Sequence, residues 1–268
     1  MGDGALAAYR RLVAAQVRGQ AQYRTSFLVE IAGSVLFAFI DVAAVLVLFN
    51  VTRTLGGFTF REAFLMASLA GCAFALADLS VGNIERLRFY VRTGLFDVIL
   101  VRPLGALPQL LAVDAAPRRV GRVLFTVGLV AVAAHLADVR WTPARVALLL
   151  VTPISGAVLF GAVFVATATV AFWWIESGEF ANALTYGGRD FTSYPMTVYG
   201  GLFRRVFAYG LGFAFVGYYP ALALLGRRDP LGLPAVAGWG GPLVAAVAAA
   251  VAGLLWRTAI RHYRSVGS

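Results

Sequence analysis

The chain has 268 residues, of which 60% are hydrophobic and only 13% are charged, and its mean hydropathy is +0.79. Soluble domains carry about 25% charged residues, so this composition excludes an ordinary water-soluble protein. We explain the formal net charge of +10 by arginines that set the membrane topology and attract anionic lipids. Apart from this charge, the sequence has no feature that supports nucleic-acid binding. We therefore expect an all-α, polytopic membrane protein that forms a single domain over residues 1–268.

The first expected element is an interfacial helix within residues 1–25. Leu6 and Tyr9 fall on one helical face, and Arg11 and Arg18 fall on another, which is the pattern of a helix lying in the membrane surface. Six apolar runs follow, each about as long as the roughly 20 residues that a spanning helix needs. These runs cover Phe27–Phe49, Ala63–Val81, Val120–Leu136, Val146–Ile175, Val206–Leu225 and Leu233–Trp256.

The fifth run has an alternative interpretation. Pro220 interrupts it, so Tyr218–Leu225 is either the end of a spanning helix or a separate re-entrant or interfacial piece. Non-helical backbone at that depth is tolerated where protein or water covers it. The sequence leaves both interpretations open.

Between the second and third runs lies a basic, amphipathic segment, Asn83–Gly105. Ile84 and Leu87 share one helical arc, whereas Arg88 and Arg92 share the opposite arc, and this pattern predicts a short helix with a charged, exposed face. Gly94 interrupts the helical pattern and Arg102-Pro103 ends it.

The distribution of arginine predicts the orientation of the chain. When both termini are placed on the same side as Asn83–Gly105, that side receives 17 of the 23 arginines, including Arg189, Arg204 and Arg205. Because basic residues are enriched in cytosolic loops, both termini and this segment are expected in the cytosol, with the chain in the inner (plasma) membrane.

Catalytic chemistry has little support in the sequence. The chain contains no lysine, so it lacks the phosphate-binding loop whose lysine contacts nucleotide phosphates. Two histidines, His135 and His262, and the single Cys72 form no recognisable metal-binding pattern. We expect no catalytic residues, no metal site and no cofactor bound by this chain.

Three carboxylates fall inside the predicted spans, namely Glu30, Asp41 and Asp78. A carboxylate within a membrane is costly and should face protein or water. The functional interpretation is a polar stripe along a conduit or a charge partner for an arginine, and the alternative for Glu30 and Asp78 is a position near a membrane boundary. These acids leave open a stand-alone secondary carrier, and a non-transporting membrane scaffold is a further alternative.

Three stretches resemble, in the expected order, the permease family of type-two ATP-binding-cassette (ABC) exporters. The segment Gly94-Leu-Phe-Asp97-Val-Ile-Leu-Val-Arg102-Pro103-Leu104 resembles that family's G-x-x-D-x-x-L-x-R-P-L pattern. Residues 213–222, FAFVGYYPAL, resemble its P-F-A-F-V-x-Y-Y-P-A pattern, and residues 256–265, WRTAIRHYRS, its W-x-x-x-x-R-x-Y-x-S ending. Gly212 replaces a proline common in the family, which leads us to expect a straighter fifth span.

The resemblance implies a permease subunit of an ATP-driven exporter that forms the substrate pathway as a homo- or heterodimer. ATP and magnesium would bind to separate ABC ATPase subunits, which would dock on a cytosolic coupling helix within residues 83–105. The expected coupling residues are Glu85, Arg88, Arg92, Gly94, Asp97, Arg102 and Pro103. The expected residues of the pathway are Glu30, Asp41, Asp78, Phe213, Tyr218 and Tyr219.

Overall fold

The computed structural model describes residues 52–112, 117–174 and 176–263, together with single positions between 29 and 49. Regular structure in these ranges is helical, apart from one isolated bridge between Leu55 and Phe58. The all-α fold class is therefore confirmed for the described part of the chain. The expected interfacial helix in residues 1–25 lies outside the described residues, as does most of the first apolar run.

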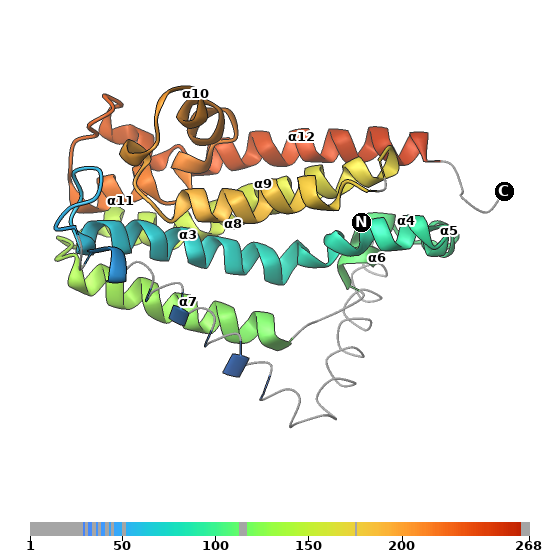
Figure 1. The fold of residues 1–268 in the computed structure, drawn as a ribbon, viewed down its shortest axis with the longest axis horizontal. Coiled ribbons are helices and arrows are strands. Elements are labelled where there is room, and N and C mark those ends of the chain that lie inside the picture. Colours follow the sequence, from blue (N-terminus) through green and yellow to red (C-terminus); the bar gives the residue numbers. More distant parts are fainter. Residues whose placement is uncertain are drawn as a thin grey trace.

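Four long helices lie side by side along the long axis of the molecule (Figure 1). Each is long and apolar enough to cross a membrane, because even 20 residues at 1.5 Å per residue extend about 30 Å. The second, third, fourth and sixth apolar runs are thus confirmed as helices of membrane-crossing length. The four helices are α3 (Phe60–Val81), α7 (Pro117–Leu136), α8 (Pro143–Thr169) and α12 (Gly241–His262).

The last helix starts later than the sequence predicts. The sixth run was expected from Leu233, but α12 begins at Gly241, and a 3-10 turn occupies Ala235–Trp239. Pro234 precedes that turn, and Gly238 packs so closely against Ala223 and the Tyr219 carbonyl that a side chain would not fit there. The apolar residues before α12 therefore cover α11 instead of extending the helix.

Helix α3 packs between α7 and α8, and aromatic rings fill its contact with α8. The ring of Phe74 lies 5.3 Å from that of Phe160 and 5.6 Å from that of Phe164. A side chain at Gly156 of α8 would collide with Ala73 of α3, so the absence of one lets the two backbones approach closely. Helix α12 packs against α8 as well, so α8 contacts both α3 and α12.

The two ends of this bundle carry different short helices (Figure 1). At one end, which we call the α4–α6 end, the chain forms α4 (Leu87–Arg92), α5 (Leu95–Leu100) and α6 (Ala106–Ala112). At the other, the α11 end, lie the loop before α3 and helix α11 (Tyr218–Leu225). Further 3-10 turns cover Gly82–Arg86, Val170–Phe172, Met196–Val198 and Phe213–Phe215.

Helix α9 (Gly178–Thr192) returns along α8 from the α4–α6 end (Figure 1). Its Tyr186 is partly exposed and packs against Phe74 and Phe164. Beyond α9, the Thr197 hydroxyl donates a 2.7 Å hydrogen bond to the Gly56 carbonyl, in the loop that precedes α3. The chain from Gly178 to Thr197 therefore runs from the α4–α6 end to the α11 end.

The fifth apolar run is sharply bent. Helix α10 (Gly201–Arg204) continues as a π-helical turn, Arg205–Gly210, and the direction of the chain then changes by 62° before α11. Gly212 lies at the bend with φ 77°, in the left-handed region that glycine adopts without strain. A side chain there would also collide with Val244 of α12. The expectation that Gly212 leaves this span straighter is therefore wrong.

Both ends of the bent segment lie at the α11 end of the molecule. Thr197, just before the segment, is bonded to Gly56, and Arg227, just after it, donates a 2.7 Å hydrogen bond to the Gly57 carbonyl. A segment that enters and leaves at the same end of the bundle has the geometry of a re-entrant hairpin, which favours the second of the two interpretations that Pro220 had left open. Its first helix, α10, lies away from the α4–α6 end (Figure 1). Arg204 and Arg205, which the sequence analysis counted on the side of the α4–α6 end, therefore move to the other side. The side of the α4–α6 end still has more arginines.

We predict that a single cysteine at Gly200 reacts from the same side of the membrane as one at Arg228, and from the opposite side to one at Arg102. Gly200 is exposed with open space beside it, and the native Cys72 is buried. Labelling with a membrane-impermeant maleimide in intact and in lysed cells measures this. Reaction at positions 200 and 102 from one side would show that the segment crosses the membrane.

Candidate coupling site at the α4–α6 end

The α4–α6 end rests on a buried ionic cluster between α3 and α7. The Asp78 carboxylate, in the last turn of α3, lies 3.0 Å from Arg119 Nε and 3.1 Å from Arg122 Nη1 of α7. Asp78 is 6% exposed and Arg119 is 8% exposed. Because a buried charge is tolerated only when it is paired, this cluster fixes the two helices to one another. The sequence interpretation of Asp78 as a charge partner for an arginine is confirmed.

Two buried amides hold the following segment in place. Asn83, which is bonded to Arg119, donates a 3.0 Å hydrogen bond to the Leu111 carbonyl at the end of α6. Gln109 of α6 donates to the Ile99 carbonyl at 3.0 Å and to the Leu104 carbonyl at 2.7 Å. The bonds of Gln109 tie the end of α5 and the loop after it to α6, and the bond of Asn83 ties the end of α6 to the turn after α3. The short helices are thereby held in one position although each is too short to be stable alone.

An aromatic cluster joins α5 to the ends of α8 and α12. The Phe96 ring of α5 is fully buried, and its centroid lies 4.9 Å from that of Tyr263 and 5.2 Å from that of Phe172. Phe172 in turn lies 5.6 Å from Trp256 of α12. Burial and the nearby Asp97 carboxylate raise the pKa of Tyr263. The cluster therefore brings the Gly94–Leu104 motif into contact with the C-terminal motif, which the sequence had identified separately.

The outer faces of α4 and α5 form an exposed surface that is both apolar and basic. Phe89 is 55% exposed, Val98 is 53% exposed and Val101 is 84% exposed. Arg92 and Arg102 are exposed beside them. Gly94, with φ 73°, forms the turn between the two helices. We call this the tip surface, and it consists of Phe89, Arg92, Leu95, Val98, Val101, Arg102 and Pro103.

The expected coupling residues divide into two groups. Arg92, Arg102 and Pro103 are exposed on the tip surface. Glu85 and Arg88 instead line a cavity of about 260 Å³ beside α8 and α9, where the Arg88 guanidinium lies against Gly178 of α9. Gly94 and Asp97, the remaining expected residues, are partly buried at the turn and in α5. The structure therefore places Glu85 and the Arg88 guanidinium on the side of the segment that faces α9.

The expected pathway residues are not brought together in one cavity. Glu30 and Asp41 lie outside the described residues. Phe213, Tyr218 and Tyr219 are at most 2% exposed inside the re-entrant hairpin. The Tyr218 hydroxyl donates a 2.8 Å hydrogen bond to Asp229, so it stabilises the hairpin. Within the described ranges no group of three His, Cys, Asp or Glu side chains lies close enough to hold a metal ion.

Several residues of this site were not singled out from the sequence, namely Asn83, Gln109 and Arg119. A sequence signal exists for Gln109, because it is a single amide within the apolar stretch of α6, and such an amide must find hydrogen-bond partners once buried. No comparable local signal exists for Arg119, whose partner lies on another helix.

The fold and this end of it define a polytopic helical membrane protein whose short-helix tip is fixed to the membrane-length helices by buried polar and aromatic contacts. Residues 35–267 match the family described as ABC-2 family transporter protein. The chain therefore belongs to the ABC-2 transporter family, the membrane permease components of ABC transporters. No curated protein and no solved structure matches the chain.

Proposed function

We propose that this chain is the membrane-spanning permease subunit of an ATP-driven ABC exporter and that separate ATPase subunits dock on its tip surface. The observation that carries the proposal is the tip surface itself. Three apolar side chains, those of Phe89, Val98 and Val101, are at least half exposed on helices that are otherwise firmly held. An exposed apolar patch with arginines around it is typical of a surface that another protein covers.

The contacts behind the tip surface suggest how motion of an ATPase would reach the membrane. A displacement of α5 acts on α8 and α12 through Phe96 and its aromatic neighbours. A displacement of α6 acts on α3 and α7 through Asn83 and the Asp78–Arg119 pair. Tightly packed contacts of this kind transmit small shifts because they are not continuously deformable. Both routes avoid the re-entrant hairpin.

The remaining parts of the proposal follow from the same assignment. ATP and magnesium bind to the partner ATPase, since this chain lacks the lysine of a phosphate-binding loop. Two permease subunits, identical or related, form the substrate pathway between them. With the tip in the cytosol, both termini are cytosolic in the inner membrane, and α9 serves as the fifth of six crossings. The ion pairs of Asp78 with Arg119 and Arg122 support a structural role for this carboxylate rather than the role that the alternative of a stand-alone carrier would give it.

The double substitution Val98→Glu/Val101→Glu is expected to reduce co-purification of the ATPase at least tenfold, because a carboxylate buried at the interface is costly to desolvate. Membrane insertion and thermal stability of the permease should change little, since both side chains are exposed. Trp141→Glu, on an exposed residue at the α11 end, is the control for added charge. Undiminished binding of the ATPase to the double variant would refute docking at the tip surface.

A further inference from the structure

A second cavity, of about 800 Å³, opens at the α11 end of the molecule. Its walls come from the start of α8, the end of α11 and the chain that leads to α12. This volume is within the range of small-molecule binding sites. The cavity is separate from the tip surface, which lies at the opposite end of the helices (Figure 1).

Three arginines line this cavity, and two of them lack a carboxylate partner. Arg227 is neutralised by Glu62, but Arg145 and Arg228 form no ion pair among the residues that the structure describes. Arg145 donates one hydrogen bond, to the Arg140 carbonyl at 2.8 Å, and retains further N–H donors. The cavity therefore offers unneutralised positive charge from two separate parts of the chain.

Among the residues that the structure describes, one carboxylate lines the cavity, that of Asp229, and it is already engaged by the protein. It accepts hydrogen bonds from the Tyr218 hydroxyl at 2.8 Å and from the backbone N–H groups of Leu231 and Leu233, each at 3.0 Å. These bonds organise the loop after α11. Asp229 consequently does not pair with Arg145 or Arg228.

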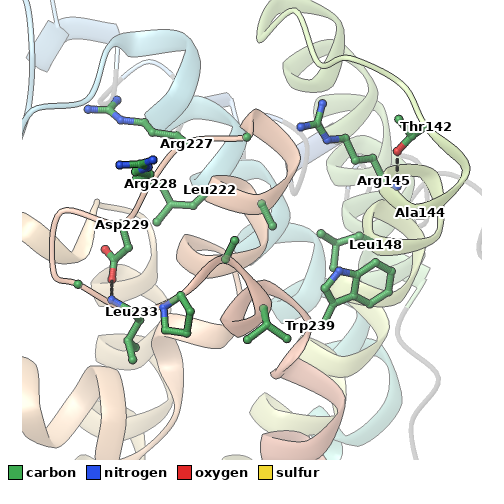
Figure 2. A pocket seen from close by; sticks show the side chains of 16 residues that line it. Thr142, Ala144, Arg145, Leu148, Leu222, Arg227, Arg228, Asp229, Leu233 and Trp239 are labelled. Atoms are coloured by element: carbon green, nitrogen blue, oxygen red, sulfur yellow. Dashed lines mark hydrogen bonds between the residues drawn. The ribbon is translucent and has the colours of Figure 1, made fainter.

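Apart from Thr142 and Asp229, the rest of the described cavity wall has no polar side chain. Figure 2 shows Arg145 on one side of the cavity and Arg227 and Arg228 on the other. Leu148 and Trp239 lie below Arg145 in this view. A ligand that fits both parts carries an anionic group joined to a hydrocarbon. Because the cavity lies at the ends of membrane-length helices, it is at the level where tryptophan and arginine meet lipid headgroups.

We propose that this cavity binds the phosphate headgroup of a membrane phospholipid, with Arg145 and Arg228 as its charged contacts. Guanidinium groups match phosphate oxygens in geometry and charge. The beginning of the acyl chain lies along Leu148 and Trp239, which gives a lipid an advantage over a free anion. The assignment is independent of ATPase docking, since it concerns the opposite end of the chain.

Titration of the full-length purified chain in neutral detergent tests this assignment. The probes are dioctanoyl-phosphatidylglycerol, dioctanoylglycerol (which lacks the phosphate) and inorganic phosphate. We expect the phosphatidylglycerol to bind most tightly and Arg145→Gln/Arg228→Gln to weaken its binding about tenfold or more, the effect of losing charge-assisted hydrogen bonds. Arg53→Gln/Arg140→Gln removes the same charge from exposed positions outside the cavity and should leave the affinity nearly unchanged.

Three outcomes would overturn the assignment. Equal binding of dioctanoylglycerol would show that the cavity recognises only hydrocarbon, and equal binding of inorganic phosphate would show a site for free anions. Equal losses in the two double variants would show that the attraction is bulk electrostatics rather than contact with Arg145 and Arg228. Circular dichroism of each variant establishes that the comparison is made on folded protein.

Discussion

Replacement of Asp78 by alanine is expected to destabilise the protein by about 3–5 kcal/mol, the cost of leaving a buried charge without its partner. Arg119 is 8% exposed and would lose its carboxylate, and Arg122 would lose the same partner. The expected result is a large fall in the unfolding temperature of the purified protein, or in the yield of inserted protein.

Two further variants make this prediction decisive. Arg61→Ala breaks an ion pair with Asp138 in which both side chains are mostly exposed, and it should cost at most about 1 kcal/mol. The triple substitution Asp78→Leu/Arg119→Met/Arg122→Met removes all three charges together and should recover much of the lost stability, since apolar replacements of buried ion pairs are often tolerated. If Asp78→Ala were as mild as Arg61→Ala, the cluster would not be a structural element.

Replacement of Phe96 by alanine is expected to abolish most of the ATPase stimulation by substrate while leaving the ATPase bound. The Phe96 ring is fully buried between Tyr263 and Phe172, and its removal leaves a cavity that costs about 3–5 kcal/mol where it cannot collapse. Helix α5 would then move without displacing α8 or α12. Co-purification and stimulated ATP hydrolysis, measured on the same preparation, separate docking from transmission.

Phe89→Ala serves as the matched control for Phe96→Ala. It removes the same side chain from α4, where the ring is 55% exposed and packs only near Tyr90 among the described aromatic residues. This variant is expected to weaken docking without disturbing the aromatic cluster. Normal stimulation in Phe96→Ala would exclude the route through α8 and α12, whereas a loss of both docking and stimulation in that variant would show that the tip has unfolded.

Hydropathy was sufficient to locate the four long helices, because a stretch of about 20 apolar residues rarely forms anything other than a membrane-length helix. It was insufficient for the fifth predicted span. Val206–Leu225 is apolar, but the chain bends by 62° within it, and helix α9, which we propose as the fifth crossing, carries Arg189 and Asp190 and so lacks the apolar signal. The hairpin's apolar side chains are buried by α3, α8 and α12, and burial against protein selects the same residues as burial in lipid.

The sequence predicted where the coupling segment turns and ends, but not which residues hold it in place. Gly94 and Arg102-Pro103 are local signals, and the structure has a left-handed turn at the first. The pairing of Asp78 with Arg119 depends on how α3 and α7 face one another, which no local pattern specifies. The position of Glu85 and Arg88 beside the cavity next to α9 likewise depends on how α9 packs, which no local pattern specifies.

The contact between Phe96 and Tyr263 also bears on the order in which the protein is made. Phe96 belongs to an early part of the chain, whereas Tyr263 follows its last long helix. Since a chain emerges from the ribosome from its N-terminus onward, α5 is synthesised long before its aromatic partner exists. The tip surface consequently reaches its final form only after nearly the entire chain has been translated, and a truncated chain would present an unfinished tip to the proposed ATPase partner.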